Sequence, residues 1–297
     1  LPEPAHGRSR GDDTSAVSSW GEARAAAAER LCSGADPRSA ALDADVLLAF
    51  ALGVTKEELL AHPEHPVSEG DAACLSTLVE RRRAGEPVAY LRGWKEFYGL
   101  RFRVDPRVLI PRPETETLVE EARRFIGGRA LTVADIGTGS GAIACAIAAH
   151  EHAVRVIATD VSPDALAVAE ANALALGVAD RVELRQGDLL VPLTERVDVI
   201  CANLPYLRDD ALADLAGERT SLAYEPRLAV VAGADGLALV RRCIADLARV
   251  LAPGGAALFE CDPPQVDVIQ HLLRQAGLAT RVLADLSGDP RVVAAQR

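Results

Sequence analysis

Asn203-Leu204-Pro205-Tyr206 is the stretch of this sequence best equipped for chemistry, and it directly follows the mostly apolar run 197–202. The side-chain carbonyl of Asn203 and the backbone carbonyl of Leu204 can each accept a hydrogen bond, so together they can hold both protons of an NH2 group. Pro205 fixes its own φ and biases Leu204 toward an extended conformation, which gives the Leu204 carbonyl one direction. Tyr206 offers a flat wall for a planar amide or base. The purely structural alternative is a strand that ends in a proline turn with a core tyrosine.

A glycine-rich stretch places Gly137, Gly139 and Gly141 between an expected strand and an expected helix. Glycines let the backbone turn tightly and let a ligand lie against it without a Cβ in the way. The following helix presents free N–H groups to an anionic part of that ligand. Asp160 ends the next strand, where its carboxylate can accept hydrogen bonds from ribose hydroxyls. Asp188 ends the third strand and is placed to reach an adenine amino group.

The glycine stretch alone leaves its ligand open. With Ala142 counted, it also fits the dinucleotide pattern G-x-G-x-x-G/A, and Asp160 fits the ribose-binding acid of that pattern. A tight turn without any ligand is a further alternative. Asp135, two residues before the first glycine, favours S-adenosylmethionine. A carboxylate there can meet the cationic end of a ligand through the loop, whereas it would repel a pyrophosphate.

Together the two features predict methyl transfer to nitrogen. A carboxamide nitrogen is a poor nucleophile because its lone pair is delocalised into the carbonyl. Two acceptors on its protons push electron density back and stabilise the positive charge that grows as a methyl group arrives from sulfur. Alignment with that methyl contributes further, on the order of 7 to 11 kcal/mol in well-oriented systems. This scheme requires no general base, since a proton can leave to water after transfer.

A parallel sheet is the element that must bring these residues together. From residue 113 onward, short apolar runs alternate with helical stretches, which predicts a parallel sheet covered on both faces. Ligands in such sheets lie beyond the carboxyl ends of the strands. We expect strands over residues 131–137, 155–160, 181–188, 197–206, 255–261, 279–286 and 291–296. We expect helices over residues 141–150, 163–177, 236–251 and 265–277.

The part of the chain before residue 113 has a different character. Residues 1–18 are polar without an apolar signal core, which predicts a disordered tail. Residues 19–87 are rich in helix formers and apolar residues at helical spacing, and we expect a small helical bundle with helix starts at Thr55 and Ser68. In residues 88–112, aromatic and β-branched residues alternate with polar ones, which predicts a hairpin linker.

Composition argues against several classes of protein. The 43 acidic residues outnumber the 32 basic ones, and the net charge of -11 argues against an extended hold on a nucleic-acid backbone. No apolar stretch reaches the roughly 18 to 20 residues that span a bilayer. The six cysteines form no CxxC pair, so we expect buried free thiols in a reducing cytoplasm and no metal site. We assign no chemistry to the six histidines.

Three stretches of the chain carry a family resemblance: ADIGTGSGAIA at residues 134–144, NLPY at 203–206 and LIPRPETETLVE at 109–120. Together they resemble the bacterial release factor glutamine methyltransferases, the PrmC or HemK family. The resemblance runs from about residue 20 to the end and includes YEPRLAV at 224–230. It implies transfer of a methyl group from S-adenosylmethionine to the side-chain amide of the glutamine in the Gly-Gly-Gln motif of peptide chain release factors.

The resemblance also implies an architecture and a set of site residues. The expected fold is α/β, a Rossmann-like class I methyltransferase with a mostly parallel seven-stranded sheet over residues 113–297. Residues 19–87 would bind the release factor, in the cytoplasm, with no membrane or direct nucleic-acid partner. Cofactor contacts are implied at Asp135, Gly137, Thr138, Gly139, Gly141, Asp160, Asp188 and Asn203. Substrate contacts are implied at Asn203, Leu204 and Tyr206, with Pro205 completing the catalytic motif, and at Pro111, Arg112, Pro113 and Glu114.

Two departures and several rivals accompany the resemblance. The family pattern is Asn-Pro-Pro-Tyr, and Leu204 stands at its second position; the family's glycine after LLE is missing from LFECDPPQ at 258–265. A loop role, with Pro113 or Thr115 shaping a first helical turn, is the alternative for residues 110–116. Adenine-specific nucleic-acid methyltransferases use the same four-residue motif on a flipped base. A ribosomal-protein glutamine methyltransferase and a catalytically dead adaptor are the other rivals.

Overall fold

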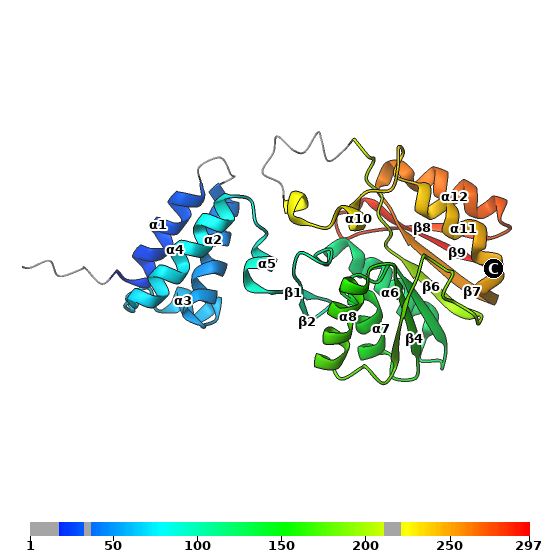
Figure 1. The fold of residues 1–297 in the computed structure, drawn as a ribbon, viewed down its shortest axis with the longest axis horizontal. Helices are drawn as coiled ribbons and strands as arrows, with labels where there is room; N and C mark the ends of the chain where they lie inside the picture. The colour runs from blue at the N-terminus through cyan, green and yellow to red at the C-terminus, as the bar shows by residue number, and fades with distance from the viewer. Residues whose placement is uncertain (1–17, 33–36, 211–220) are drawn as a thin grey trace, which may run out of the picture. The chain divides into compact units, whose positions relative to one another are not determined.

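The computed structural model describes residues 18–32, 37–210 and 221–297. The chain divides into two compact units, Leu1–Ala84 and Gly85–Arg297 (Figure 1). The expected disordered tail, residues 1–18, lies outside the described residues except for Ser18. Within the described ranges, no helix has both the length and the apolarity that crossing a bilayer would require.

The first unit is helical, as predicted from its composition and spacing (Figure 1). Its helices α1, α2 and α4 pack on one another around side chains such as Leu47, Leu48 and Val79. The predicted helix starts are confirmed: the side-chain oxygens of Thr55 and Ser68 accept hydrogen bonds from the backbone three residues later. The helices are α1 (Trp20–Leu31), α2 (Pro37–Leu52), α3 (Lys56–Ala61) and α4 (Glu69–Arg83).

The second unit opens with a short helix and a hairpin. Helix α5 spans Val88–Arg92, and strands β1 (Trp94–Phe97) and β2 (Leu100–Arg103) pair antiparallel. Tyr98 and Gly99 form the turn, both with positive φ. The hairpin predicted between residues 88 and 112 is therefore present.

A seven-stranded sheet forms the centre of the second unit, in the order β5-β4-β3-β6-β7-β9-β8. The first five strands in this order are parallel, and β9 runs antiparallel to both β7 and β8. This confirms the predicted α/β fold with a mostly parallel sheet. The strands are β3 (Thr132–Ile136), β4 (Arg155–Asp160), β5 (Val182–Gln186), β6 (Val197–Ala202), β7 (Leu251–Glu260), β8 (Ala279–Ala284) and β9 (Pro290–Gln296).

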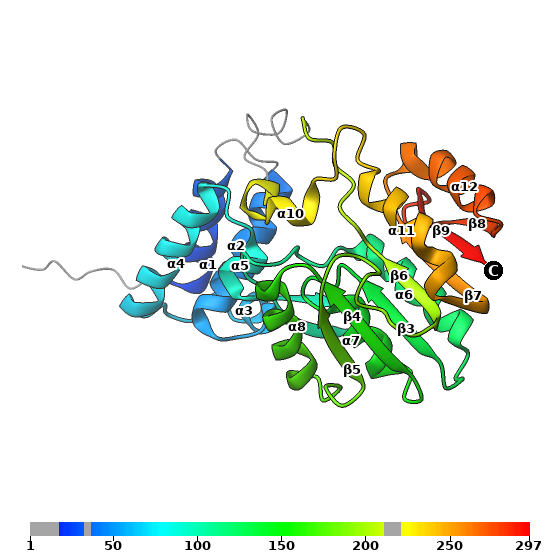
Figure 2. The same ribbon diagram turned by 45° about the vertical axis from the view of Figure 1, so that its right-hand side comes forward.

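Helices cover both faces of this sheet (Figure 2). Alternate residues of a strand point to opposite faces, so Val133 packs with α6 and α7 while Ala134 packs with α11 and α12. Helix α8 lies beside α7 over β4 and β5. The helical segments are η1 (Pro113–Thr115), α6 (Glu116–Ile126), α7 (Ala142–His150), α8 (Pro163–Ala175), η2 (Ser221–Tyr224), α10 (Arg227–Val230), α11 (Ala238–Val250), η3 (Pro263–Gln265) and α12 (Val266–Gln275).

Strand register brings four chain segments to one edge of the sheet. Ile136 of β3 lies opposite Thr159 on β4 and opposite Ala202 on β6. Ala202 in turn lies opposite Phe259 on β7. The residues that follow at this edge are Gly137, Asp160, Asn203 and Glu260.

The cysteines follow the prediction only in part. Cys145, Cys201, Cys243 and Cys261 are buried free thiols, as expected. Cys74 is exposed and Cys32 half-buried, so the expectation of burial is wrong for these two, which lie on and after helices with a solvent-facing side.

Replacement of Gly236 by alanine should strongly lower the free energy of unfolding. Gly236 has a φ of +71°, and an added Cβ would lie 2.0 Å from the carbonyl oxygen of Tyr206. Gly254 is the matched control, because its φ is +76° and a Cβ there meets nothing within 4 Å. We expect Gly254→Ala to cost roughly 1–2 kcal/mol for its left-handed backbone, and Gly236→Ala to cost roughly 1–3 kcal/mol more for the clash. Urea unfolding measures both, and equal losses would contradict this packing.

Candidate active site

The glycine loop connects β3 to α7 in a conformation that favours glycine. Gly137, Gly139 and Gly141 have φ values of +71°, +55° and +78°. A Cβ on Gly137 would lie 3.2 Å from Leu204 Cδ2, and one on Gly141 would lie 3.1 Å from Ala169 Cβ. At Gly139 a Cβ would meet nothing within 4 Å. The loop is therefore packed at both ends and open in the middle, where a ligand can approach the backbone.

Asp135 lies directly beneath this loop and is fully buried. Its Oδ2 accepts hydrogen bonds from the Thr138 hydroxyl at 2.6 Å and from the Ala144 backbone N–H at 3.1 Å. Its Oδ1 has no hydrogen-bond partner among the described residues. Burial raises the pKa of Asp135 to about 7, against the opposing effect of these two hydrogen bonds. A cationic group of a ligand would give this buried carboxylate oxygen the partner that it lacks.

Asp160 and Asp188 lie at the ends of the next two parallel strands. Asp160 is half-buried; its Oδ2 accepts from the Gly139 backbone N–H at 2.9 Å, and its Oδ1 accepts from Ser162 N–H at 2.9 Å. Asp160 thus holds the glycine loop. Asp188 instead forms an ion pair with Arg242 of α11, a partner that the sequence did not suggest.

The Asn203–Tyr206 stretch leaves β6 next to the glycine loop. Asn203 donates from Nδ2 to the Thr115 hydroxyl oxygen at 3.0 Å. The Leu204 side chain is buried against Gly137, and its carbonyl accepts no hydrogen bond from any residue that the structure describes. The Tyr206 carbonyl accepts from Gln265 Nε2 at 3.0 Å, and burial raises the pKa of the Tyr206 phenol to about 12. This stretch is therefore held at both ends while the Leu204 acceptor stays free.

Two cavities meet at Asn203. One is lined by the glycine loop from Gly137 to Ser140 together with Thr115 and Asn203. The other is lined by Asn203, the segment Leu204–Leu207 and the η2–α10 region. Leu109 and Arg112 line both. The site thus offers one approach to the glycine loop and a second approach to the Asn203 amide.

Of residues 110–116, Pro111, Arg112 and Thr115 line the first cavity and Arg112 lines the second. A buried carboxylate anchors this segment. Arg112 Nη2 lies 2.5 Å from Glu225 Oε1, and the Ile110 N–H donates to Glu225 Oε2 at 3.2 Å. Burial raises the pKa of Glu225, with the charge of Arg112 opposing the change. Pro111 is buried, whereas Pro113 is exposed and Glu114 half-exposed.

Pro113 opens η1, as the alternative for this segment expected, and Thr115 ends it. Its side chain makes no capping hydrogen bond, because the hydroxyl lies against Asn203 instead. Sequence reasoning also missed Glu260, which ends β7 beside Asn203, and Gln265, which holds Tyr206. For Glu260 a signal existed: a carboxylate ends an apolar strand there, as Asp160 does.

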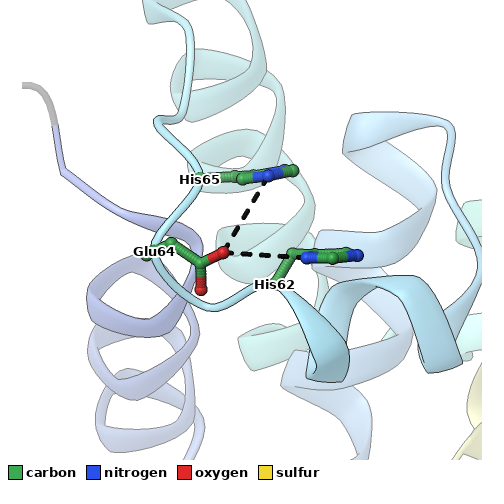
Figure 3. Close-up of side chains that lie close together, drawn as sticks. All are labelled: His62, Glu64 and His65. Carbon is green, nitrogen blue, oxygen red and sulfur yellow. Dashed lines mark ion pairs between the residues drawn. The ribbon is translucent and has the colours of Figure 1, made fainter.

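Outside this edge, the loop after α3 brings His62, Glu64 and His65 together (Figure 3). Glu64 Oε1 lies 3.6 Å from Nδ1 of His62 and 4.0 Å from Nε2 of His65. The rings are stacked, with centroids 4.8 Å apart and planes at 8°. A ring nitrogen binds metal through a lone pair in the ring plane, and nearly parallel planes do not direct both lone pairs at one ion. We therefore interpret this exposed cluster as side chains that interact with one another at the surface, and we assign it no metal.

Fold and site together define a class I methyltransferase that uses S-adenosylmethionine. The open face at Gly139 and the unpaired oxygen of Asp135 both fit that cofactor. A family model of the PrmC N-terminal domain matches residues 22–93, and one of the methyltransferase small domain matches residues 115–223. The chain belongs to the release factor glutamine methyltransferase family, and the resemblance seen in the sequence is confirmed.

Relatives and solved structures agree with this placement. The release factor glutamine methyltransferase of Moorella thermoacetica is 42% identical over 275 residues, covering 91% of this chain and 96% of that protein. That of Bordetella pertussis is 44% identical, covering 87% of this chain and 95% of that protein. The catalytic domain of hMettl16, solved with the MAT2A 3'UTR hairpin 6, matches with a TM-score of 0.55 at 18% identity, covering 77% of this chain and 82% of that chain. This last likeness shows the fold alone.

The burial of Asp135 predicts a pH-dependent stability. Its pKa is about 7 in the folded protein against an ordinary value of 3.8, so between these values the folded state holds a proton that the unfolded chain has released. The free energy of unfolding therefore falls as pH rises through this range, by at most about 4 kcal/mol from this group. Asp135→Asn removes the effect, so the variant should gain stability relative to wild type as pH rises.

Urea unfolding from about pH 4.5 to about pH 8 measures this relative gain. Asp180→Asn, at an exposed site, is the control for loss of a surface carboxylate. A constant difference between Asp135→Asn and wild type across this range would show that Asp135 is not protonated in the folded protein.

Proposed function

We propose that this protein transfers a methyl group from S-adenosylmethionine to the side-chain amide nitrogen of the glutamine in the Gly-Gly-Gln motif of peptide chain release factors, in the cytoplasm. The products are N5-methylglutamine and S-adenosylhomocysteine. The observation that carries the proposal is the meeting of two cavities at Asn203, beside an unoccupied backbone acceptor at Leu204. The names of relatives at about 40% identity support the choice of substrate.

The cofactor side of the site would be formed by the glycine loop and its carboxylates. S-adenosylmethionine, when bound, supplies the electrophilic methyl group. Gly137, Thr138, Gly139 and Gly141 would provide a backbone surface without obstructing side chains, and Asp135 would face the cationic end of the ligand through the loop. Asp160 would accept from the ribose. Asp188 would accept from the adenine amino group through Oδ1, because Arg242 pairs with its Oδ2.

The substrate side would be formed by the residues after β6. Asn203 Oδ1 and the Leu204 carbonyl would accept the two amide protons, which raises electron density on nitrogen and stabilises the charge that grows there. Pro205 would hold the Leu204 carbonyl in place, and the ring of Tyr206 would pack on the planar amide. Pro111, Arg112, Pro113 and Glu114 would form the wall, which the Arg112–Glu225 pair fixes.

Leucine in place of the family proline at position 204 is compatible with this mechanism. The Leu204 side chain is 2% exposed and packs against Gly137. A proline at position 204 would restrain the backbone through its ring. Here the packing of the Leu204 side chain restrains it instead. The acceptor role therefore does not depend on a proline at this position.

Substrate and methylated atom can be tested in one assay. Incubation with radiolabelled S-adenosylmethionine and a bacterial release factor should label the factor. The same factor carrying Gln→Ala in Gly-Gly-Gln is the matched control and should stay unlabelled. Label on both factors would place the methyl group elsewhere, and label on neither would reject the proposed function.

Asn203→Ala should abolish transfer while leaving cofactor binding nearly intact. The variant removes one of the two acceptors, and loss of one preorganised contact to developing charge costs roughly 100- to 1000-fold in kcat. Affinity for S-adenosylhomocysteine should stay within a few-fold, because the side chain faces the substrate. Gln275→Ala removes an exposed amide on α12 and serves as the control. An active, folded Asn203→Ala variant would remove Asn203 from the mechanism.

Residues 19–87 are proposed to bind the body of the release factor. The support for this is their position as a compact unit ahead of a complete methyltransferase fold. Deletion of residues 1–86 should weaken methylation of an intact release factor far more than binding of S-adenosylhomocysteine. Calorimetry and the labelling assay measure the two effects, and equal losses would reject this role.

A further inference from the structure

Glu260 is a buried carboxylate that the mechanism above leaves unused. It follows Phe259, the β7 partner of Ala202, and is 2% exposed. Among the described residues no cation forms an ion pair with it: Arg291 lies 3.3 Å from Asp285 and 3.8 Å from Asp262 instead. A carboxylate in such a position requires hydrogen-bond donors. The identity of those donors indicates what Glu260 does.

The side chains placed to donate are those of Thr115 and Asn203. Glu260 lies next to Asn203 in the β6–β7 register, and hydrogen bonding from Thr115 and Asn203 lowers the pKa of its carboxyl. Thr115 is itself 4% exposed, and its Oγ1 accepts from Asn203 Nδ2 at 3.0 Å. Oε2 of Glu260 has no hydrogen-bond partner in the part of the chain that the structure describes. Three side chains from η1, β6 and β7 therefore form one polar group inside the protein.

The number of protons on each side chain determines which of the three donates a hydrogen bond and which accepts one. A hydroxyl has a single proton, and an ionised carboxylate can only accept. When Thr115 donates to ionised Glu260, its oxygen can only accept from Asn203, so Asn203 must present its NH2 group to Thr115. The Asn203 carbonyl oxygen then points to the other side of the amide. A reversed amide would instead present donors to a substrate NH2 group, which also donates.

We propose that Glu260 is a positioning residue that, through Thr115 and by its own contact with Asn203, fixes which end of the Asn203 amide faces the substrate nitrogen. The inference deepens the proposed function and rests on it for its catalytic consequence, because an enzyme that grips an NH2 group needs an acceptor there. Asn203 touches the substrate, whereas Glu260 and Thr115 act through it.

The orientation depends on the charge of Glu260, and so on the groups that face it. Burial raises its pKa to about 7; Thr115, Arg291 of β9 and Asn203 lower it, and Glu114 of η1 raises it. Tyr206 and Cys261 also face it, but the pKa of each is raised to about 12, so neither changes charge near neutral pH. Protonated Glu260 can donate to Thr115 and so favour the reversed amide. Methylation should therefore slow as pH falls through about 7.

NMR of the full-length protein tests the arrangement without a substrate. The side-chain amide signals of Asn203, assigned by their loss in Asn203→Ala, should shift with a midpoint near pH 7. In Glu260→Gln this titration should disappear. An Asn203 amide that titrates equally in Glu260→Gln, or that does not titrate in the wild type, overturns the proposal.

Kinetics with matched variants test the consequence. Thr115→Val keeps the shape and removes the hydroxyl, whereas Thr115→Ser keeps the hydroxyl. Thr115→Val and Glu260→Gln should each lower kcat roughly 10- to 100-fold, with little change in the affinity for S-adenosylhomocysteine, and Thr115→Ser should recover most of the rate. Glu260→Gln should also lose the fall in rate at lower pH; if it keeps that fall, another group such as Asp135 causes it and the proposal fails.

Different results would reject the proposed function and the positioning role of Glu260. A folded wild-type protein that does not methylate a release factor rejects the proposed function, and the amide titration then decides the positioning role alone. An active wild type with Thr115→Val at the same kcat rejects the positioning role and leaves the proposed function standing.

Discussion

The parallel register of β3, β4, β6 and β7 is the constraint on which the whole site depends. Parallel strands release their carboxyl ends at the same edge of a sheet. Because β3 pairs with β4 and β6, and β6 pairs with β7, the glycine loop, Asp160, Asn203 and Glu260 leave the sheet side by side. A shift of one residue in the β3–β6 pairing would turn the side chains of one strand to the opposite face and separate Asn203 from the loop.

Two buried carboxylates lie at this edge of the sheet. Asp135 and Glu260 are both almost fully buried, and burial raises the pKa of each to about 7. Each has one carboxylate oxygen that no described residue pairs with. Burying such groups lowers stability, so their presence beside the cavities points to function. Asp135 lies under the loop where a cation would rest, and Glu260 lies behind the amide that would hold the substrate.

Much of this architecture follows from local patterns in the sequence. Alternating apolar runs and helical stretches determine the α/β sheet, and helix caps such as Thr55 mark element starts. The glycine loop and the Asn203–Tyr206 stretch can be recognised in the sequence because their functional groups belong to residues that are adjacent in the chain. The partners of these groups were not predictable in this way. Thr115 meets Asn203 across 88 positions, and Arg112 meets Glu225 across 113. Such pairings arise from tertiary packing, which no local spacing specifies.

At two positions the fold supplies a partner that the sequence did not indicate. Thr115 stands where a first-turn residue would cap a helix, yet packing turns its hydroxyl toward β6. Asp188 ends a strand in the manner of a ligand-binding acid, yet Arg242 reaches it from α11. Both cases show that the residue type was informative while the partner was set by the fold.

The central claim concerns two oxygen atoms and one nitrogen, and a crystal structure tests it most directly. The protein would be crystallised with S-adenosylhomocysteine and a peptide containing Gly-Gly-Gln. The glutamine amide nitrogen should lie about 3 Å from both Asn203 Oδ1 and the Leu204 carbonyl oxygen, with the cofactor sulfur on the glycine-loop side. A glutamine amide bound elsewhere, or one whose nitrogen lies beyond hydrogen-bond reach of the Asn203 side chain or of the Leu204 carbonyl oxygen, would contradict this arrangement.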